Sequence, residues 1–242
     1  MKITILTLFP DMFHGFLDTS IIKKARLKNL VEINLVDFRE YSTLKTKRVD
    51  DYPYGGGSGM VLRYQPVVAA LKQHQSPDSS VIMLSPSGNL FNQKLARKLS
   101  NKQDLILICG HYEGYDERIL QHVDQVISIG DYVLTGGELA SMVLSDAVIR
   151  LLPEVISDGS KSEESFENEL LEYPHYTRPE TIAGQKVPDV LISGNHQKIA
   201  EYRLKESFKK TLIYRPDLIK NYKFDKAALK SFKQAKDELK ED

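Results

Sequence analysis

The stretch Gly110-His111-Tyr112-Glu113-Gly114-Tyr115-Asp116-Glu117-Arg118 decides the fold together with Ser128–Glu138, which reads SIGDYVLTGGE. Each stretch follows or overlaps a short apolar run, Leu105–Cys109 or Val126–Ile129, of the kind that forms a buried strand. Glycine at a strand exit lets the backbone turn sharply and lets a ligand approach the main chain closely. Two such exits, both rich in carboxylates and tyrosine, predict the walls of one pocket.

Apolar runs and helical periodicity alternate around this block. Further strand-like runs are Ile3–Phe9, Val31–Val36 and Val81–Leu84. Apolar spacings of three and four residues predict helices at Asp11–Lys28, Gln65–Gln73, Phe91–Leu99, Asp116–His122 and Glu138–Leu152. This alternation predicts an α/β fold with a parallel sheet covered on both faces. Ligands of such sheets usually bind beyond the carboxyl ends of the strands, where Leu84-Ser85-Pro86 and the two glycine-containing stretches fall.

The composition is typical of a globular chain in a reducing compartment. The 242 residues suit one large domain, or a core domain with a small appendage. A single cysteine, Cys109, excludes a disulfide framework and a cysteine-built zinc site. No segment approaches the ~20 apolar residues of a membrane span, and the N-terminal MKITILTLFP reads as a strand and not as a secretory signal. We therefore expect a cytoplasmic protein without a membrane partner.

Charge is distributed unevenly although the net charge is zero. From Tyr173 to the C-terminus there are 15 Lys and Arg against 10 Asp and Glu, whereas the remainder has 18 against 23. A basic C-terminal part is compatible with nucleic acid, because phosphate contacts supply most sequence-independent affinity. The alternative is that lysine-rich helices simply form a solvated surface.

A polar, acidic stretch separates two parts of the chain. Between Glu154 and Glu172 there are 7 acidic residues and only one basic residue, Lys161. A connection of this kind is either a disordered linker or a functional loop. We expect a core domain at 1–156, a flexible acidic linker at 157–173 and a small helical domain at 174–242. The periodicity of the last part predicts helices at Asn195–Lys210 and Lys226–Leu239.

Several common catalytic motifs are missing from the sequence. The glycine-rich segment Tyr54–Met60 lacks the G-x-G-x-x-G spacing, and no G-x-x-x-x-G-K-[ST] occurs. No histidine pair has a zinc-ligand spacing such as H-E-x-x-H, and no G-x-S-x-G elbow is present. Dinucleotide-dependent oxidoreductases, P-loop enzymes and serine hydrolases are therefore poor fits, and we expect no dedicated metal site.

Several blocks taken together resemble one family, the bacterial tRNA (guanine-N1)-methyltransferases (TrmD) of the SPOUT superfamily. In addition to the two central stretches, these blocks are Leu8–Phe13, Asp50–Met60, Leu84–Pro86, Pro174–Pro179 and Ser193–His196. The resemblance implies a SPOUT domain with a C-terminal trefoil knot, a rare exception to the rule that chains do not thread. It also implies transfer of a methyl group from S-adenosylmethionine to N1 of guanine 37 of tRNA, a modification that prevents frameshifting.

The resemblance assigns S-adenosylmethionine, in a bent shape, to the loops of the knot. Loops with few bulky side chains can offer backbone N–H and C=O groups to an adenine edge and a ribose. The residues expected around the cofactor are Leu84, Ser85, Pro86, Gly110, Tyr112, Glu113, Gly114, Ser128, Ile129, Gly130, Tyr132, Leu134, Gly136 and Gly137. Two alternatives stay open: the glycines only permit tight packing, and Glu113 either binds the methionyl amino group or holds its own loop.

The resemblance also implies a catalytic pair, Glu164 and Arg150. The family carries an aspartate before Ser-Phe in the linker, and this chain has Glu164-Ser165-Phe166, in a linker that is one residue shorter. Glu164, or its neighbour Glu163, would remove the N1 proton of guanine. Arg150 would stabilise the charge on guanine O6 or orient the base, unless it only satisfies carbonyls at a helix C-terminus.

For the tRNA, the resemblance points to cationic, aromatic and amide side chains. Asp50 and Asp51 contact the guanine or a Mg²⁺ ion, or else form an ordinary turn. The remaining candidates are His175, Tyr176, Arg178, Asn195, His196, Arg203 and Arg215, with Lys205, Lys209 and Lys210 on one helix. Tyr202 and Tyr214 depart from the tryptophan and arginine that are frequent in the family. Because the linker is far along the chain from the knot, the family builds each site from both subunits of a homodimer.

Two other functions remain open on the sequence alone. One is a non-catalytic RNA-binding relative, which the replacement of aspartate by Glu164 favours. The other is a SPOUT methyltransferase for another RNA, which the match at Pro174–Pro179 disfavours.

Overall fold

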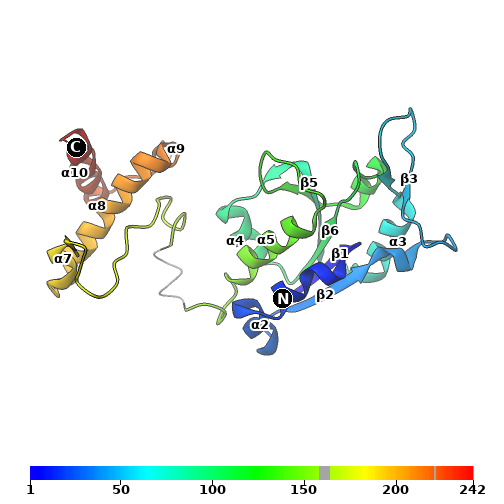
Figure 1. Ribbon diagram of the computed structural model, residues 1–242, viewed down its shortest axis with the longest axis horizontal. Helices are drawn as coiled ribbons and strands as arrows, with labels where there is room; N and C mark the ends of the chain where they lie inside the picture. The colour runs from blue at the N-terminus through cyan, green and yellow to red at the C-terminus, as the bar shows by residue number, and fades with distance from the viewer. Residues whose placement is uncertain (158–163, 221, 242) are drawn as a thin grey trace. The chain divides into compact units, whose positions relative to one another are not determined.

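A five-stranded parallel sheet organises the first of two structural units (Figure 1). The computed structural model describes residues 1–157, 164–220 and 222–241, and the chain divides into unit 1, Met1–Ser157, and unit 2, Asp158–Asp242. The sheet order is β2-β1-β6-β5-β7, and every pairing is parallel. The strands are β1 (Lys2–Thr7), β2 (Glu32–Asp37), β5 (Ser79–Leu90), β6 (Asp104–Cys109) and β7 (Gln125–Ser128). The predicted α/β fold with a parallel sheet is therefore confirmed.

Helices cover both faces of this sheet, as its apolar sequence requires. In β6 all six residues are buried, with Leu105 and Leu107 in one apolar cluster and Ile106 and Ile108 in the other. Such alternation follows from the two-residue period of a strand. The longer helices of unit 1 are α2 (Ser20–Leu27), α3 (Tyr64–His74), α4 (Gln93–Ser100) and α5 (Glu138–Ile149).

Two of the predicted helices were wrong in detail. The helix expected at Asp11–Lys28 is divided into a 3₁₀ turn at Pro10–Phe13 (η1), α1 (His14–Leu17) and α2, because Ser20 has a φ of +51° that interrupts the helical path. The segment expected as a helix at Asp116–His122 is a 3₁₀ helix, η3 (Glu117–His122). A third 3₁₀ turn, η2, spans Phe38–Tyr41.

The strand predicted at Val81–Leu84 continues to Leu90 through an irregularity. Its register against β7 shifts between Leu84 and Asn89, so the intervening residues leave the ladder. A bulge of this kind bends a strand and redirects its side chains. Ser85 and Pro86 lie in this irregularity, at the end of the sheet where the glycine-containing loops emerge.

A short hairpin docks on the first of these loops. Strands β3 (Asp50–Asp51) and β4 (Val61–Leu62) are antiparallel. The backbone of Leu62 donates to Gly114 O at 2.9 Å and accepts from Asp116 N at 2.8 Å, and Glu113 N donates to Met60 O at 3.1 Å. The hairpin is thereby fixed to the stretch that follows β6.

Unit 2 is built mainly from helices around a small aromatic core. Phe208 is fully buried and contacts the rings of Tyr222, Phe224 and Phe232. The elements are β8 (Thr181–Ile182), β9 (Gln185–Lys186), α7 (Asp189–Ile192), α8 (His196–Tyr214), α9 (Pro216–Ile219) and α10 (Lys226–Glu241). The helix predicted at Asn195–Lys210 is thus one turn longer, because α8 continues to the residue before the Arg215-Pro216 pair.

Of the linker expected at 157–173, residues 158–163, which include Glu163, lie outside the described residues. The following residues pack within unit 2, where Leu170 is 4% exposed and belongs to the core of Phe208. None of the helices in the described ranges has the length and apolar character needed to cross a membrane.

Candidate functional site

A cavity lies at the carboxyl ends of β5, β6 and β7. It brings together all fourteen residues that the sequence analysis placed around a cofactor. Six further lining residues were missed: His111, Tyr115, Ile127, Val133, Thr135 and Ala140. Each of them lies close in the sequence to a predicted residue. Because the strand ends of a parallel sheet converge, these residues could also have been predicted to line the cavity.

Backbone contacts join two walls of this cavity. His111 and Gly136 form an isolated antiparallel bridge, and Gly137 N donates to Gly110 O at 2.8 Å. A Cβ atom on Gly137 would lie 2.7 Å from Cys109 Cα and 2.9 Å from Gly110 N. Gly137 is therefore required for packing. This agrees with the interpretation that the glycines permit tight packing of the loops. Gly114 differs, because nothing lies within 4 Å of an added Cβ but its φ is +152°, which side-chain-bearing residues rarely adopt.

A buried carboxylate follows the lining residue Gly137. Glu138, at the start of α5, is 2% exposed and accepts a hydrogen bond from Thr7 Oγ1 at 2.8 Å. The same hydroxyl oxygen accepts from Phe9 N at 2.9 Å, so β1 and α5 are linked through one polar contact. Burial and the nearby Glu138 charge raise the pKa of the Cys109 thiol, although a hydrogen bond with Ser141 opposes them. Cys109 is thus a protonated packing residue and not a nucleophile.

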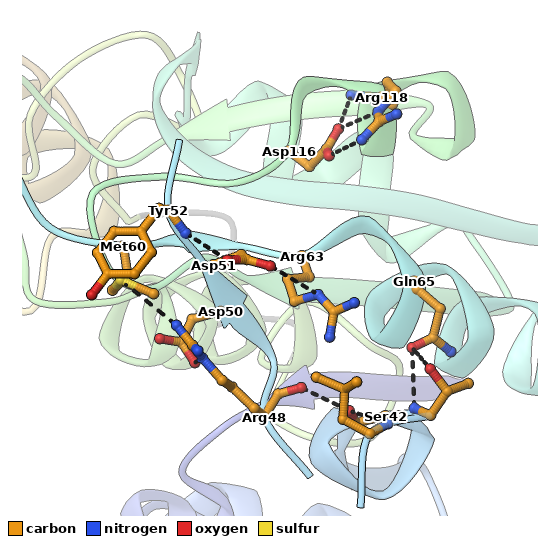
Figure 2. A network of polar contacts seen from close by, with 12 residues as sticks. Ser42, Arg48, Asp50, Asp51, Tyr52, Met60, Arg63, Gln65, Asp116 and Arg118 are labelled. Carbon is orange, nitrogen blue, oxygen red and sulfur yellow. Dashed lines mark hydrogen bonds and ion pairs between the residues drawn. The ribbon is translucent and has the colours of Figure 1, made fainter. Parts of the chain in front are cut away.

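The charge of Asp50 acts on Tyr112, which lines the cavity. Burial and then the Asp50 charge raise the pKa of Tyr112, while Arg39 and Arg48 oppose that shift. Figure 2 shows the ion pair between Arg48 Nε and Asp50 Oδ1, at 3.4 Å. The hairpin therefore brings Asp50 and Arg48 to the side of the cavity that Tyr112 forms.

Asp51 points elsewhere, as alternation along β3 requires. Its carboxylate accepts from Tyr52 N at 2.9 Å and lies 3.9 Å from Arg63 Nε (Figure 2). Both aspartates thus have arginine partners. Across the described parts of the chain, no three His, Cys, Asp or Glu side chains converge as metal ligands would.

Arg150 is the C-cap residue of α5 and directly follows Ile149. Its backbone N–H donates to Asp146 O at 3.1 Å, and the residue is half-buried. This position fits the helix-terminus interpretation as well as a functional one, so its catalytic role stays a prediction.

Glu164 lines a cavity within unit 2. His196, Arg203 and Tyr173 line the same cavity. The Arg203 guanidinium lies over the Tyr173 ring at 4.6 Å from the centroid. Glu164 and the α8 residues His196 and Arg203, which are far from Glu164 in the sequence, therefore line one hollow.

Other residues predicted to contact tRNA line a second hollow of unit 2 or serve a local role. His175, Tyr176 and Arg178 line a cavity with Arg203, and His175 Nε2 lies 2.7 Å from Glu172 Oε1. Asn195 caps α8 by accepting from Lys198 N at 3.1 Å. Arg215 forms an ion pair with Asp217 at 2.7 Å.

Comparison with known proteins identifies the family. The model of the family described as tRNA (Guanine-1)-methyltransferase TrmD matches residues 1–221. A tRNA (guanine-N(1)-)-methyltransferase of Dictyoglomus turgidum is 52% identical over 243 residues, which cover 100% of this chain and 99% of the relative. One of Bacillus cereus (strain AH820) is 54% identical over 242 residues, covering 98% and 99%. The chain belongs to the TrmD family.

The TrmD family match ends at residue 221, before α10 begins at Lys226. The Dictyoglomus relative nevertheless covers the whole chain, so this last helix has a counterpart in a full-length member of the family. The similarity to TrmD sequences therefore extends over both units.

Proposed function

We propose that this chain transfers a methyl group from S-adenosylmethionine to N1 of guanine 37 in tRNA. The observation that carries the proposal is the cavity of unit 1, formed by three loops that a TrmD-type sequence predicts as cofactor loops. The two relatives described above are named tRNA (guanine-N(1)-)-methyltransferase, and their alignments cover 100% and 98% of this chain.

The lining residues fit the proposed methyl donor chemically. Leu84, Ile129 and Leu134 offer apolar surface, while the glycines leave main-chain N–H and C=O groups accessible. Glu113 provides a carboxylate for an amino group. When bound, S-adenosylmethionine would supply a methyl group already activated by its sulfonium. The remaining task of the protein is to align the guanine and to accept its N1 proton.

We assign the proton transfer to Glu164 and the stabilisation of charge on guanine O6 to Arg150. A correctly placed general base contributes ~10²–10⁴-fold, and a preorganised cation opposite a developing negative charge adds to it. We assign contact with the guanine to Asp50, whose charge acts on Tyr112 in the cavity wall. If Mg²⁺ assists the reaction, we assign Asp50 as a carboxylate ligand.

We further propose a trefoil knot and a homodimer with shared sites. The close packing of Gly137 against Cys109 and Gly110 is compatible with the tight loop packing that such a knot requires. Sharing would let Glu164 of one subunit act at the cavity of the other. Unit 2 would bind the tRNA through His175, Tyr176, Arg178 and His196, because unpaired bases stack on aromatic rings and phosphates require cations.

The test is labelled methyl transfer from S-adenosylmethionine to a tRNA transcript with guanines at positions 36 and 37. The matched control carries adenine at position 37. Incorporation into the first transcript alone supports the proposal. Cofactor binding without any incorporation would contradict it and indicate a non-catalytic tRNA-binding relative, whereas incorporation into both would indicate another target nucleotide.

A further inference from the structure

The turn that follows Glu164 is attached to α8 by a buried hydroxyl. Leu171 N donates to Thr211 Oγ1 at 2.9 Å, and Thr211 is fully buried. The hydroxyl hydrogen of Thr211 is donated to Ser207 O at 2.7 Å. Because that hydrogen is committed to the helix, the oxygen lone pairs are oriented toward Leu171 N. The adjacent Leu170 side chain enters the core beside Phe208.

The turn itself has a defined backbone. Phe166 N donates to Leu170 O at 2.8 Å, Glu172 N donates to Ser165 Oγ at 3.0 Å, and Glu167 N donates to Glu164 O at 3.2 Å. Phe166 and Glu169 have φ values of +73° and +61°. Non-glycine residues keep this conformation only where surrounding contacts hold it. The position of Glu164 therefore depends on what holds the turn.

Arg215 contacts the turn through the ring of Phe166. Its guanidinium lies 5.7 Å from the centroid of the Phe166 ring, within the range of a cation–π contact. Its Nε and Nη2 atoms donate to the two carboxylate oxygens of Asp217 at 2.9 and 2.7 Å. The planar guanidinium is thereby fixed against Phe166, which is two residues after Glu164.

We propose that Thr211 and Arg215 are positioning residues for Glu164. Thr211 fixes the end of the turn, and Arg215 fixes it through Phe166 instead of binding a tRNA phosphate. The inference rests on the proposed function, which makes Glu164 the base. Its consequence is catalytic, because a displacement near 1 Å of a reacting group can cost ~10²-fold in rate.

The first test compares Thr211→Val with Thr211→Ser in the full-length chain. Valine removes the acceptor for Leu171 N, whereas serine retains it. We expect Thr211→Val to lower kcat about 10- to 100-fold with KM for tRNA changed less than about twofold, and Thr211→Ser to stay within about threefold of the wild type. Equal rates for valine and serine would overturn the proposal. Circular dichroism melting confirms that each variant is folded.

Arg215→Met provides a second variant, at an exposed position that does not threaten the core. Lys233→Met, on the exposed face of α10, is its matched control for the loss of one cation. We expect Arg215→Met to lower kcat with little change in KM or in its salt dependence. A higher KM with a reduced salt slope and unchanged kcat would instead identify a phosphate contact and overturn the assignment.

A double-mutant cycle with Glu164→Gln separates positioning from independent effects. In single-turnover reactions, the loss caused by Thr211→Val or Arg215→Met should shrink to less than about twofold when Glu164 is already replaced. Losses that multiply would overturn the inference alone. A wild-type chain that transfers no methyl group would overturn the proposed function and this inference together.

Discussion

The cavity of unit 1 and the Glu164 turn of unit 2 are held by different kinds of contact. In the cavity, main chain meets main chain, as in the Gly137–Gly110 hydrogen bond and the His111–Gly136 bridge. In the turn, side chains anchor the main chain in addition to its own backbone hydrogen bonds, as Thr211 does for Leu171. The packed backbone at Gly137 leaves no room for an added atom, whereas a side-chain anchor can be loosened without removing the turn. We therefore expect substitutions in the cavity to impair cofactor binding, and substitutions in the Glu164 turn to impair methyl transfer without weakening cofactor binding.

The largest effect on the cavity is expected from Gly137→Ala. The new methyl group would lie 2.7 Å from Cys109 Cα, and backbone atoms cannot move aside as a flexible side chain can. We expect S-adenosylmethionine affinity to fall ~10²-fold or more and unit 1 to lose about 1–3 kcal/mol of stability. Calorimetric titration and thermal melting measure both. Gly15→Ala is the control, since no atom lies within 4 Å of its added Cβ, and equal effects of the two changes would refute the packing argument.

Leu170→Ala tests the other region. Truncation of this buried side chain should cost unit 2 about 2–5 kcal/mol, while S-adenosylmethionine binding in unit 1 stays unchanged. Hydrogen exchange read by mass spectrometry should show faster exchange in α8 and no change in β6. Weaker cofactor binding by this variant would contradict the separation of the two regions.

Glu138, which is buried next to the lining residue Gly137, allows a sharper comparison within unit 1. Glu138→Ala leaves the buried Thr7 hydroxyl without its acceptor and should cost about 1–3 kcal/mol of unfolding free energy. Glu138→Gln keeps an acceptor oxygen and should cost less. Urea unfolding at neutral pH measures the difference, and an equally stable alanine variant would show that this hydrogen bond contributes nothing.

The smallest expected effect is on the pH dependence of the stability of unit 2. Hydrogen bonds from Lys205 Nζ and Lys209 Nζ lower the pKa of Glu238. Its folded pKa is below the unfolded value of about 4.3, so the ion pairs stabilise unit 2 above that pH and stop doing so as pH falls through the folded pKa. Since Glu238 is 40% exposed, Glu238→Gln should cost less than about 1 kcal/mol at pH 7. A stability difference that persists in strong acid would exclude this ionic origin.

The two regions also differ in how far the sequence could predict them. Continuous apolar runs such as Leu105–Cys109 predict buried parallel strands, and parallel strand ends converge, so the lining of the cavity followed from local patterns. The anchor at Thr211 did not, because it joins residues 40 positions apart through one side-chain oxygen. The division of Asp11–Lys28 was also missed, since the positive φ of Ser20 carries no glycine or proline signal. Cofactor and tRNA roles of individual residues remain predictions.

The most direct test of the account measures cofactor binding and methyl transfer on the same samples of wild type and Glu164→Gln. Calorimetry gives the affinity for S-adenosylmethionine, and a single-turnover assay gives transfer to a tRNA transcript with guanine at position 37. We expect equal affinities and a transfer rate ~10²–10⁴-fold lower in the variant, because the base is removed while the cavity is unchanged. Equal transfer rates, or a loss of cofactor binding by Glu164→Gln, would contradict the division of binding and chemistry between the two regions.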